Sequence, residues 1–275
     1  MTSSFHGMRL GAFSLTIIKD GSGGRRPLTD LVAEIPEDLE DRRIFMEGGL
    51  MMVDTPGERL LVDAGNGPNR GPRRREAEAA FRDLGITPES IDTILLTHGD
   101  PDHISGLLDS HGRLVYPRAH IVLSTDLWDA FRSEPEAGLY FAGQSHFLRT
   151  LTDRIADRVT CFGTEGEVRP GITAVPAPGH RTGHAVFRFE SEGNVLYHIG
   201  DAAFDPLFLE RTDLVVEMEY RPREARATRE RLANRMSDDG AWIVGSHFDV
   251  SNVGTLARTD RADRFAWQPP GAAAA

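Results

Sequence analysis

Cysteine is almost absent from this chain, which has one cysteine among 275 residues. The single thiol, Cys161, excludes a disulfide framework within the chain and any zinc site rich in cysteine. We expect Cys161 to be a small residue of the hydrophobic core. Long apolar runs are missing as well, since no stretch approaches the roughly 20 residues that a transmembrane helix needs. Residues 1–10 lack a basic region followed by an apolar one, so we expect no secretory signal and no membrane partner.

Positive charge is also scarce: the chain has 31 Lys and Arg residues against 42 Asp and Glu residues, and its formal net charge is −11. Because DNA and RNA are polyanions, this balance argues against nucleic acid as a partner. No Ser-His-Asp arrangement stands out, and the glycine-rich residues 21–24 are too weak a signal for phosphate binding. Taken together, the composition favours a cytoplasmic protein.

The length and composition fit one large α/β domain that spans residues 1–275, because a chain that is 40% hydrophobic can bury a sizeable core. Strand patterns alternate with helical ones, which indicates an α/β layer. Within the domain we expect an N-terminal strand and insertion at residues 1–45. We also expect a helical insertion at residues 126–156 that lines a pocket or an interface, and a flexible tail at residues 268–275.

The periodicity of apolar residues places the individual elements. Buried or alternating apolar runs predict strands at residues 9–18, 44–53, 59–62, 94–96, 119–123, 172–175, 184–189, 194–199 and 241–244. Apolar stripes at helical spacing predict helices at residues 73–84, 143–156 and 222–236. Ser124 or Thr125 can cap a further helix that runs through Phe131. The glycine-rich residues 20–24 should end the first strand in a mobile turn.

The densest group of candidate metal ligands follows a buried strand. The apolar residues 94–96 are followed by four side chains that can bind metal: His98, Asp100, Asp102 and His103. Imidazole and carboxylate groups are the usual protein ligands of zinc and of harder divalent metals. A rigid strand followed by a tight loop can direct several such groups to one point. A solvated acidic turn is the alternative, and it is disfavoured because His and Asp recur downstream after further strands.

This stretch resembles the first motif of the metallo-β-lactamase superfamily, H-x-H-x-D-H at the end of a buried strand. Other landmarks of that family appear in the same order. Residues 60–65 resemble its early strand with Asp-x-Gly, and residues 177–184 resemble its second motif. Residues 197–201 resemble the strand that ends in a bridging Asp. Residues 244–247 resemble the strand that ends in the last His. The resemblance covers residues 46–248.

The resemblance implies an αββα sandwich of four layers, in which two mixed sheets pack face to face with helices outside. It also implies a site with two metals. One metal would be held by His98, Asp100 and His180, the other by Asp102, His103 and His247, with Asp201 bridging both. In this family Asp63 hydrogen-bonds the metal loop and His184 supports the site.

The activity that the resemblance implies is hydrolysis. Two divalent metals about 3.5–4 Å apart, with zinc as the first expectation, can share a hydroxide and lower the pKa of its parent water toward neutrality. That hydroxide would open a lactone or cleave a small carboxylic ester, while the metals stabilise the oxygens that gain charge. Asp102 and Asp201 are the expected catalytic carboxylates.

One position departs from the family pattern, because Asp100 stands where the family has its second His. The change replaces a nitrogen ligand by an oxygen ligand and adds negative charge. We therefore expect some shift in preference from zinc toward iron or manganese. A more anionic site should also leave its bound water less acidic.

The substrate pocket is less clearly marked in the sequence. Residues 214–259 look most like the branch of quorum-quenching lactonases and methyl-parathion-type organophosphate hydrolases, which also suggests a homodimer. The loop after Asp201 begins at the metal, and pockets are mostly apolar. The aromatic candidates for substrate binding are Phe141, Phe204, Phe208 and Phe248.

Several other activities stay open. A phosphotriester is the second substrate class, followed by a β-lactam or a glutathione thioester. An iron-dependent oxidoreductase is a different class, because flavodiiron proteins share the fold and carry a carboxylate at the position of Asp100. Those proteins add a flavin domain, for which 275 residues leave no length; an enzyme similar to the mono-iron sulfur dioxygenases is the other redox alternative. A non-catalytic binding protein with an altered site at Asp100 is the third class.

Overall fold

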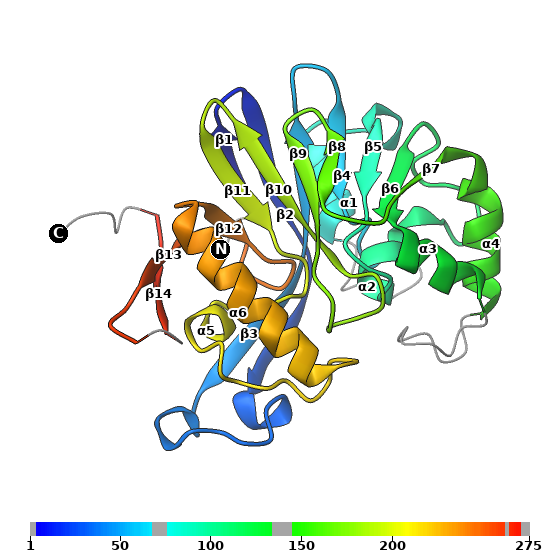
Figure 1. Cartoon of the computed structure of the whole chain (residues 1–275). Helices are drawn as coiled ribbons and strands as arrows, with labels where there is room; N and C mark the ends of the chain where they lie inside the picture. Colours follow the sequence, from blue (N-terminus) through cyan, green and yellow to red (C-terminus); the bar gives the residue numbers. More distant parts are fainter. Residues whose placement is uncertain (1–3, 68–75, 134–144, 262–263, 271–275) are drawn as a thin grey trace.

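Two β-sheets form the centre of the computed structural model, which describes residues 4–67, 76–133, 145–261 and 264–270 (Figure 1). The larger sheet has seven strands in the order β1-β2-β3-β4-β5-β6-β7. Their bounds are β1 Phe5–Leu10, β2 Phe13–Pro27, β3 Arg43–Asp54, β4 Arg59–Val62, β5 Thr93–Leu95, β6 His120–Ser124 and β7 Val159–Phe162. Strands β1 to β4 pair antiparallel, and β4 to β7 pair parallel.

The smaller sheet has five strands in the order β12-β11-β10-β9-β8. Their bounds are β8 Gly166–Arg169, β9 Ile172–Pro176, β10 Ala185–Ser191, β11 Asn194–His198 and β12 Trp242–Val244. Only the pair β11–β12 is parallel; the other neighbours are antiparallel. A separate pair of strands, β13 Thr255–Arg258 and β14 Phe265–Gln268, follows near the C-terminal end.

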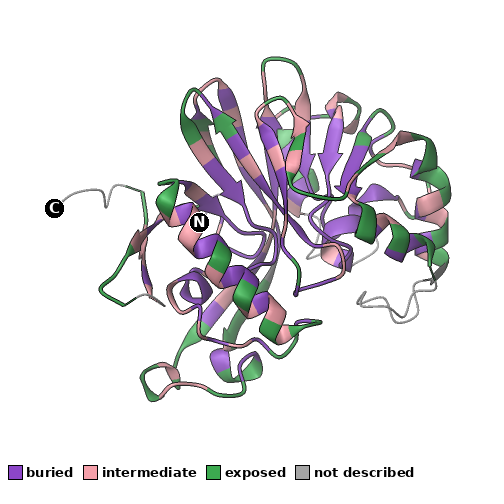
Figure 2. Cartoon of the chain, in the orientation of Figure 1, coloured by how far each residue is buried: buried purple, intermediate pink, exposed green. Residues whose placement is uncertain are grey.

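The sheets pack face to face through an apolar layer. Side chains from the larger sheet, such as Met51 and Leu95, meet Phe187 and Phe189 of the smaller sheet in one buried cluster. Because successive side chains of a strand point to opposite faces, Leu61 joins a different cluster on the outer face of the larger sheet. Figure 2 shows the buried residues concentrated in the two sheets.

Helices cover both outer faces. On the larger sheet lie α1 Glu76–Asp83, α3 Thr125–Arg132 and α4 Ser145–Ile155, whose apolar side chains share one cluster with that sheet. On the smaller sheet lie α5 Leu207–Glu210 and α6 Pro222–Asp238. The predicted cap is confirmed, since the Ser124 hydroxyl accepts a hydrogen bond from the Leu127 backbone at 3.1 Å. The four predicted layers are therefore present.

The N-terminal strand differs from its prediction. A turn at Gly11, with φ of +56°, separates β1 from β2, and β2 then continues through the glycine-rich residues to Pro27. The register against β3 shifts between Lys19 and Ser22 and again between Ser22 and Gly24. Irregularities of this kind absorb extra residues without ending a strand. The predicted mobile turn at residues 20–24 is wrong for this reason.

One smaller prediction also fails, and another differs at a single residue. Cys161 is exposed and not in the core, because β7 is the edge strand of the larger sheet and leaves this side chain without a cover. The first residue of the predicted tail, Gln268, still pairs with Thr255 in β14. In the same strand, Trp267 packs edge to face against Phe248, with 5.8 Å between ring centroids. Residues 271–275 lie outside the described residues, so the flexible tail stays a prediction.

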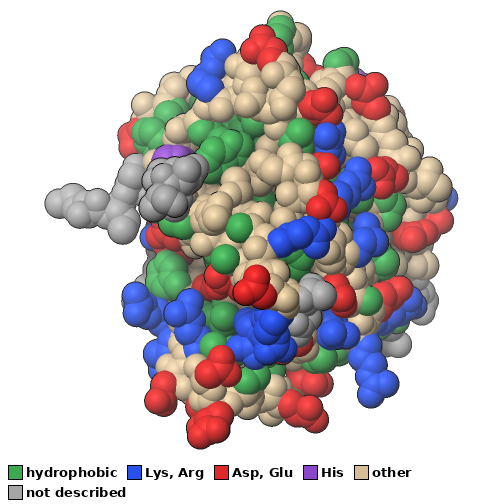
Figure 3. Space-filling model, turned by 60° about the vertical axis from the view of Figure 1, so that its left-hand side comes forward, with side chains coloured by type: hydrophobic (Ala, Val, Ile, Leu, Met, Phe, Trp, Pro, Cys, Tyr) green, Lys and Arg blue, Asp and Glu red, His purple; other side chains and the backbone are tan. Residues whose placement is uncertain are grey.

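On the face shown in Figure 3, acidic and basic side chains are interspersed, so neither sign of charge dominates. Among the described residues, the large apolar side chains that are exposed are Met218 and Tyr220, at 42% and 47%. None of the described helices combines the length and the apolar character needed to cross a membrane.

Candidate metal centre

The candidate ligands lie in loops that follow strands of both sheets. In the larger sheet, β5 leads to His98, and the short helix α2 Pro101–Ile104 carries Asp102 and His103. In the smaller sheet, His180 follows β9, and Asp201 and His247 follow the parallel strands β11 and β12. Parallel neighbours present their carboxyl ends at the same edge of a sheet, so these loops meet at one end of the sandwich.

The first group of donors consists of His98, Asp100 and His180, all three buried. The Asp100 Oδ2 atom lies 3.8 Å from His98 Nε2 and 3.7 Å from His180 Nε2. Asp201 adjoins this group, with its Oδ2 atom 3.8 Å from His98 Nε2 and 3.4 Å from His180 Nε2.

The second group consists of Asp102, His103 and His247. Asp102 Oδ2 lies 3.8 Å from His103 Nε2 and 3.7 Å from His247 Nε2. Asp201 also adjoins this group, because its Oδ1 lies 3.4 Å from His103 Nε2 and its Oδ2 lies 3.0 Å from His247 Nε2. The structure thus brings together the two predicted triplets with Asp201 between them.

The donor atoms fit divalent metal ions. Within the described chain, the buried atoms that make no hydrogen bond include His98 Nε2, His103 Nε2, Asp201 Oδ1 and both ring nitrogens of His180. A buried polar atom left unsatisfied costs roughly 1–3 kcal/mol. Donors about 2.1 Å from a tetrahedral zinc lie roughly 3.4 Å from one another, and the separations here run from 3.0 to 3.8 Å. Bound metals would satisfy Asp201 Oδ1 and one ring nitrogen of each of these histidines, at separations close to those observed.

Asp63 holds the first motif in place through hydrogen bonds. Its carboxylate accepts hydrogen bonds from the Thr97 backbone N–H and hydroxyl, both at 2.8 Å, and from His103 Nδ1 at 2.7 Å. Because His103 donates from Nδ1, its Nε2 is left to face the other donors. Burial alone would raise the pKa of Asp63, but His103 outweighs it and holds the pKa below its ordinary value.

His184 supports Asp201 and is not itself one of the clustered donors. Its Nδ1 donates to the Ala177 carbonyl at 3.0 Å, which leaves Nε2 to accept from the Asp201 backbone N–H at 3.2 Å. Burial, together with the charge of His98, lowers the pKa of His184 to about 3. A neutral imidazole with this tautomer fixes the position of the Asp201 backbone.

The electrostatics of the centre favour ionised carboxylates. Burial would raise the pKa of Asp201, but His247, His103 and His98 outweigh it and keep the pKa well below its usual range. Burial would lower the pKa of His247, yet Asp201 and Asp102 raise it to about 9. The apo protein therefore holds charge pairs where metals would replace the imidazole protons.

Arg181 is a residue of the site that the sequence reasoning missed. Asp100 occupies the N-cap position of α2, but its side chain makes no capping bond. Its Oδ1 instead accepts a hydrogen bond from Arg181 Nε at 2.9 Å, and both side chains are buried. Burial would raise the pKa of Asp100, but His98, His180 and Arg181 outweigh it and lower the pKa. The available signal was an arginine directly after the second-motif histidine.

The predicted aromatic residues differ in their distance from the donors. Phe204 lies against His180 and His247, with 5.5 Å between ring centroids in each case. Phe208 packs edge to face against Phe204 and is fully buried, and Phe248 is buried against Trp267. Of these three residues, Phe204 alone touches the donor histidines. Phe141 lies outside the described residues.

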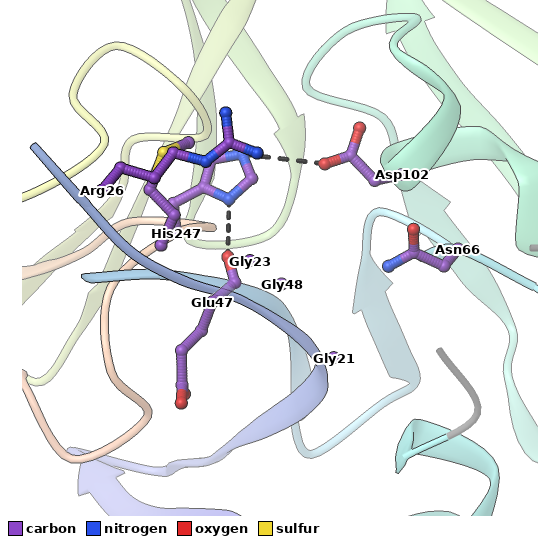
Figure 4. Close-up of a pocket in the computed structure, with 9 residues that line it drawn as sticks. Gly21, Gly23, Arg26, Glu47, Gly48, Asn66, Asp102 and His247 are labelled. Carbon is purple, nitrogen blue, oxygen red and sulfur yellow. Dashed lines mark hydrogen bonds and ion pairs between the residues drawn. The ribbon is translucent and has the colours of Figure 1, made fainter. Parts of the chain in front are cut away.

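A pocket of about 150 Å³ opens beside the second group of donors (Figure 4). Its lining includes Asp102, His247, Asn66 and Arg26, and the bulged part of β2 forms one wall. In Figure 4 the Asp102 carboxylate lies opposite His247, with 3.7 Å between Asp102 Oδ2 and His247 Nε2. His247 Nδ1 donates to the Glu47 carbonyl at 2.6 Å, so its Nε2 is turned to the other donors. The residues predicted to be a mobile turn thus form part of the site.

Comparison with known proteins bears on this site. The sequence model of the metallo-β-lactamase superfamily matches residues 50–247. A probable metallo-hydrolase of Mycobacterium bovis and one of Mycobacterium tuberculosis are each 26% identical over an alignment of 187 residues. The match covers 56% of this chain and 56% of each relative. The chain spans about half the length of the curated relatives that it matches.

Solved structures show the same fold. The hydrolase AbOPH of the β-lactamase superfamily and AidC, a dizinc quorum-quenching lactonase with bound product, each superpose with a TM-score of 0.83 at 20% identity over 98% of both chains. A quorum-quenching N-acyl homoserine lactone lactonase superposes with a TM-score of 0.66 at 16% identity, over 88% of this chain and 94% of the lactonase. Since the family's sequence model spans all the clustered donors, the chain belongs to the metallo-β-lactamase superfamily.

Proposed function

We propose that this chain is a metal-dependent hydrolase that opens a lactone or cleaves a small carboxylic ester. The observation that carries the proposal is the meeting of two donor triplets around Asp201, with imidazole nitrogens that make no hydrogen bond in the described chain. Lactone is the first substrate class because quorum-quenching lactonases of known structure share the fold over most of their length.

The proposed ligands are those that the structure gathers. One metal, zinc first and iron or manganese as alternatives, would be held by His98, Asp100 and His180. The second would be held by Asp102, His103 and His247, with Asp201 serving both. Bound there, the metals would polarise a carbonyl group and lower the pKa of a water.

The protein's own side chains orient this chemistry. Asp63 fixes the ring of His103, and His184 fixes the backbone of Asp201. Phe204 lies against two donor histidines and keeps water from that side of the centre. Asp102 is the most open of the carboxylates, at 30% side-chain exposure, and it lines the pocket. We therefore propose Asp102 and Asp201 as the catalytic carboxylates.

The pocket favours a compact substrate end. Its volume of about 150 Å³ accommodates a small ring or ester group beside Asp102 and His247. Arg26 lines the same pocket and offers a positive charge to a polar group of the substrate. This arrangement supports a small lactone or ester as the substrate.

The test combines metal analysis with a substrate panel. Protein purified without added metal is analysed for zinc, iron and manganese, then assayed on lactones, aryl esters, a phosphotriester, a β-lactam and a glutathione thioester. We expect two metals per chain and turnover of a lactone or carboxylic ester, and we expect H180A to lose both metal and turnover. Turnover of the phosphotriester, the β-lactam or the thioester alone would overturn the substrate assignment.

Two further outcomes would overturn the hydrolase itself. Bound iron with oxygen uptake and no hydrolysis would indicate an oxidoreductase. Failure to bind zinc, manganese or iron would indicate a binding protein with an altered site. A matched control is Arg258→Met, because Arg258 forms an exposed ion pair with Asp238 outside the donor clusters. That variant should keep both metals and full activity.

A further inference from the structure

The two oxygens of Asp100 have different surroundings. Oδ1 accepts a hydrogen bond from Arg181 Nε at 2.9 Å. Oδ2 faces the imidazole nitrogens of His98 at 3.8 Å and His180 at 3.7 Å. The side chains of Asp100 and Arg181 are only 10% and 5% exposed. One oxygen is therefore engaged by a buried cation while the other is directed to the first donor group.

The Arg181 guanidinium is held in place by backbone carbonyls. Its Nη1 donates to the carbonyl of His180 at 2.8 Å and to that of Met218 at 3.1 Å. The guanidinium group is planar and rigid, so the hydrogen bonds that Nη1 donates also fix the direction of the Nε–H bond. Arg181 thus presents Nε to Asp100 from a position fixed by its neighbours.

A second buried ion pair anchors the same segment. Glu219, next to Met218, pairs with Arg229 at 2.9 Å, and both side chains are fully buried. Arg229 also donates to the carbonyl of Ala202, the residue after Asp201, at 3.2 Å. The segment around residues 218–219 is therefore tied by Arg181 to Asp100 and by Arg229 to the backbone next to Asp201. This arrangement resists movement of Arg181 away from Asp100.

Charge explains what the pair does. A neutral histidine at this position would bring no charge to the centre, whereas an aspartate brings one negative charge. Arg181 adds one positive charge at hydrogen-bond distance, so the pair together is neutral. Donation to Oδ1 also draws electron density from the carboxylate and occupies one of its two oxygens.

We propose that Asp100 and Arg181 form one paired ligand, in which Arg181 offsets the extra negative charge and leaves Oδ2 for the metal. This inference rests on the proposed metal centre and assigns Arg181 as a positioning residue. The unit replaces a neutral histidine by a neutral pair. The added carboxylate consequently leaves the net charge of the centre, and with it the affinity for zinc, close to that of a site with histidine.

The test is a double-variant cycle on zinc affinity, measured without substrate. Wild type, D100H, R181M and D100H/R181M are stripped of metal, and zinc binding is followed by competition with a chromophoric chelator. In each single variant, we expect the more weakly bound of the two zinc ions to bind about 10–100-fold less tightly than in wild type. The double variant should bind zinc within about tenfold of wild type, because it removes both charges together and leaves a site with a neutral histidine.

Additive losses across the cycle would overturn the proposal, since Arg181 would then act only by holding the Met218 carbonyl. Unchanged zinc affinity in R181M would overturn it as well. R181K is the second variant, used if the double variant does not fold: it keeps the charge but loses the fork. Zinc affinity for R181K between those of wild type and R181M supports the charge role, and affinity equal to that of R181M opposes it. R258M serves as the control and should bind zinc like wild type.

The readout separates this inference from the proposed activity. Zinc affinity is measured on protein with no substrate present, so an inactive but zinc-binding protein would refute the hydrolase and still decide the role of Arg181. An active enzyme whose variants show additive losses would refute the paired ligand alone.

Discussion

His103 donates a hydrogen bond from Nδ1 to the Asp63 carboxylate at 2.7 Å, and Asp63 holds this position from a left-handed backbone conformation with φ of +60°. A residue other than glycine adopts this backbone conformation at an energetic cost, so the surrounding contacts must stabilise it. The Thr97 backbone and hydroxyl supply those contacts. The early strand β4 and the ligand loop after β5 are thereby coupled through one carboxylate.

Asp63→Asn should weaken zinc binding by about 10–100-fold. The asparagine NH2 group is a donor, so it cannot accept the hydrogen bonds that the carboxylate accepts from Thr97 and His103. Chelator competition on the metal-free protein measures the effect. Asp92→Asn is the control, since Asp92 accepts a hydrogen bond from the Arg59 backbone at the start of the central strands. Zinc affinity equal to wild type in Asp63→Asn would contradict the supporting role.

Removing metal should destabilise the folded chain, because buried imidazole nitrogens and three carboxylates would then lose their shared partner. With free zinc about a thousandfold above its dissociation constant, binding contributes about 4 kcal/mol to the free energy of unfolding. Thermal unfolding before and after chelation measures this difference. Added zinc should restore the melting temperature and magnesium should not, since imidazole suits zinc. A melting temperature that chelation leaves unchanged would argue against bound metal.

Arg229→Met should lower the free energy of unfolding by about 3–5 kcal/mol, because it leaves the Glu219 carboxylate buried without its cation. Both side chains are fully buried, and Arg229 also holds the carbonyls of Ala202 and Leu214. Urea unfolding of the metal-free protein measures the change. The control Arg258→Met removes an exposed ion pair and should cost about 1 kcal/mol or less. Equal costs for the two variants would show that burial of the pair is not decisive.

Asp20→Asn should change how stability depends on pH. Burial raises the pKa of Asp20 from 3.8 to about 7, although hydrogen bonds from Asn66 act in the opposite direction. The folded chain therefore binds this proton more tightly than the unfolded chain, and the contribution of Asp20 to the free energy of unfolding falls as pH rises from about 4 to 7. The variant should gain stability relative to wild type over that range, by up to about 4 kcal/mol.

The measurement for Asp20→Asn is urea unfolding of both metal-free proteins at several pH values. The asparagine oxygen can still accept from the Asn66 backbone N–H, which Asp20 accepts at 2.6 Å, so the fold should persist. A constant difference between variant and wild type across this pH range would refute the raised pKa.

Gly179→Ala should disturb the second motif next to His180. Gly179 has φ of +125°, and an added Cβ would lie 2.2 Å from the Ala225 backbone nitrogen at the start of α6. We expect a loss of about 1–3 kcal/mol from this crowding, together with weaker zinc binding. Gly57→Ala is the matched control, because a Cβ there meets nothing within 4 Å. Comparable melting temperatures for the two variants would contradict the close approach of α6.

Much of the site could be predicted from the sequence because its signals are local. Each clustered donor lies in the loop or short helix that follows a strand, and parallel strands end at a common edge. The positions of His98, His180, Asp201 and His247 after their strands were therefore enough to predict that these side chains lie close together. The four layers follow in the same way from alternating strand and helical patterns, whereas the homodimer and the cytoplasmic location stay predictions.

Contacts between distant segments decided the rest. Arg181 and Asp100 are separated by 81 positions, so their pairing has no local signature. The exposure of Cys161 depends on β7 lying at a sheet edge, and the bulged β2 remains a strand because β3 pairs with it. Hydrogen-bond partners, burial and charge compensation are properties of the assembled chain. Apolar periodicity and the spacing of ligands after strands are properties of short segments, which is why those could be read beforehand.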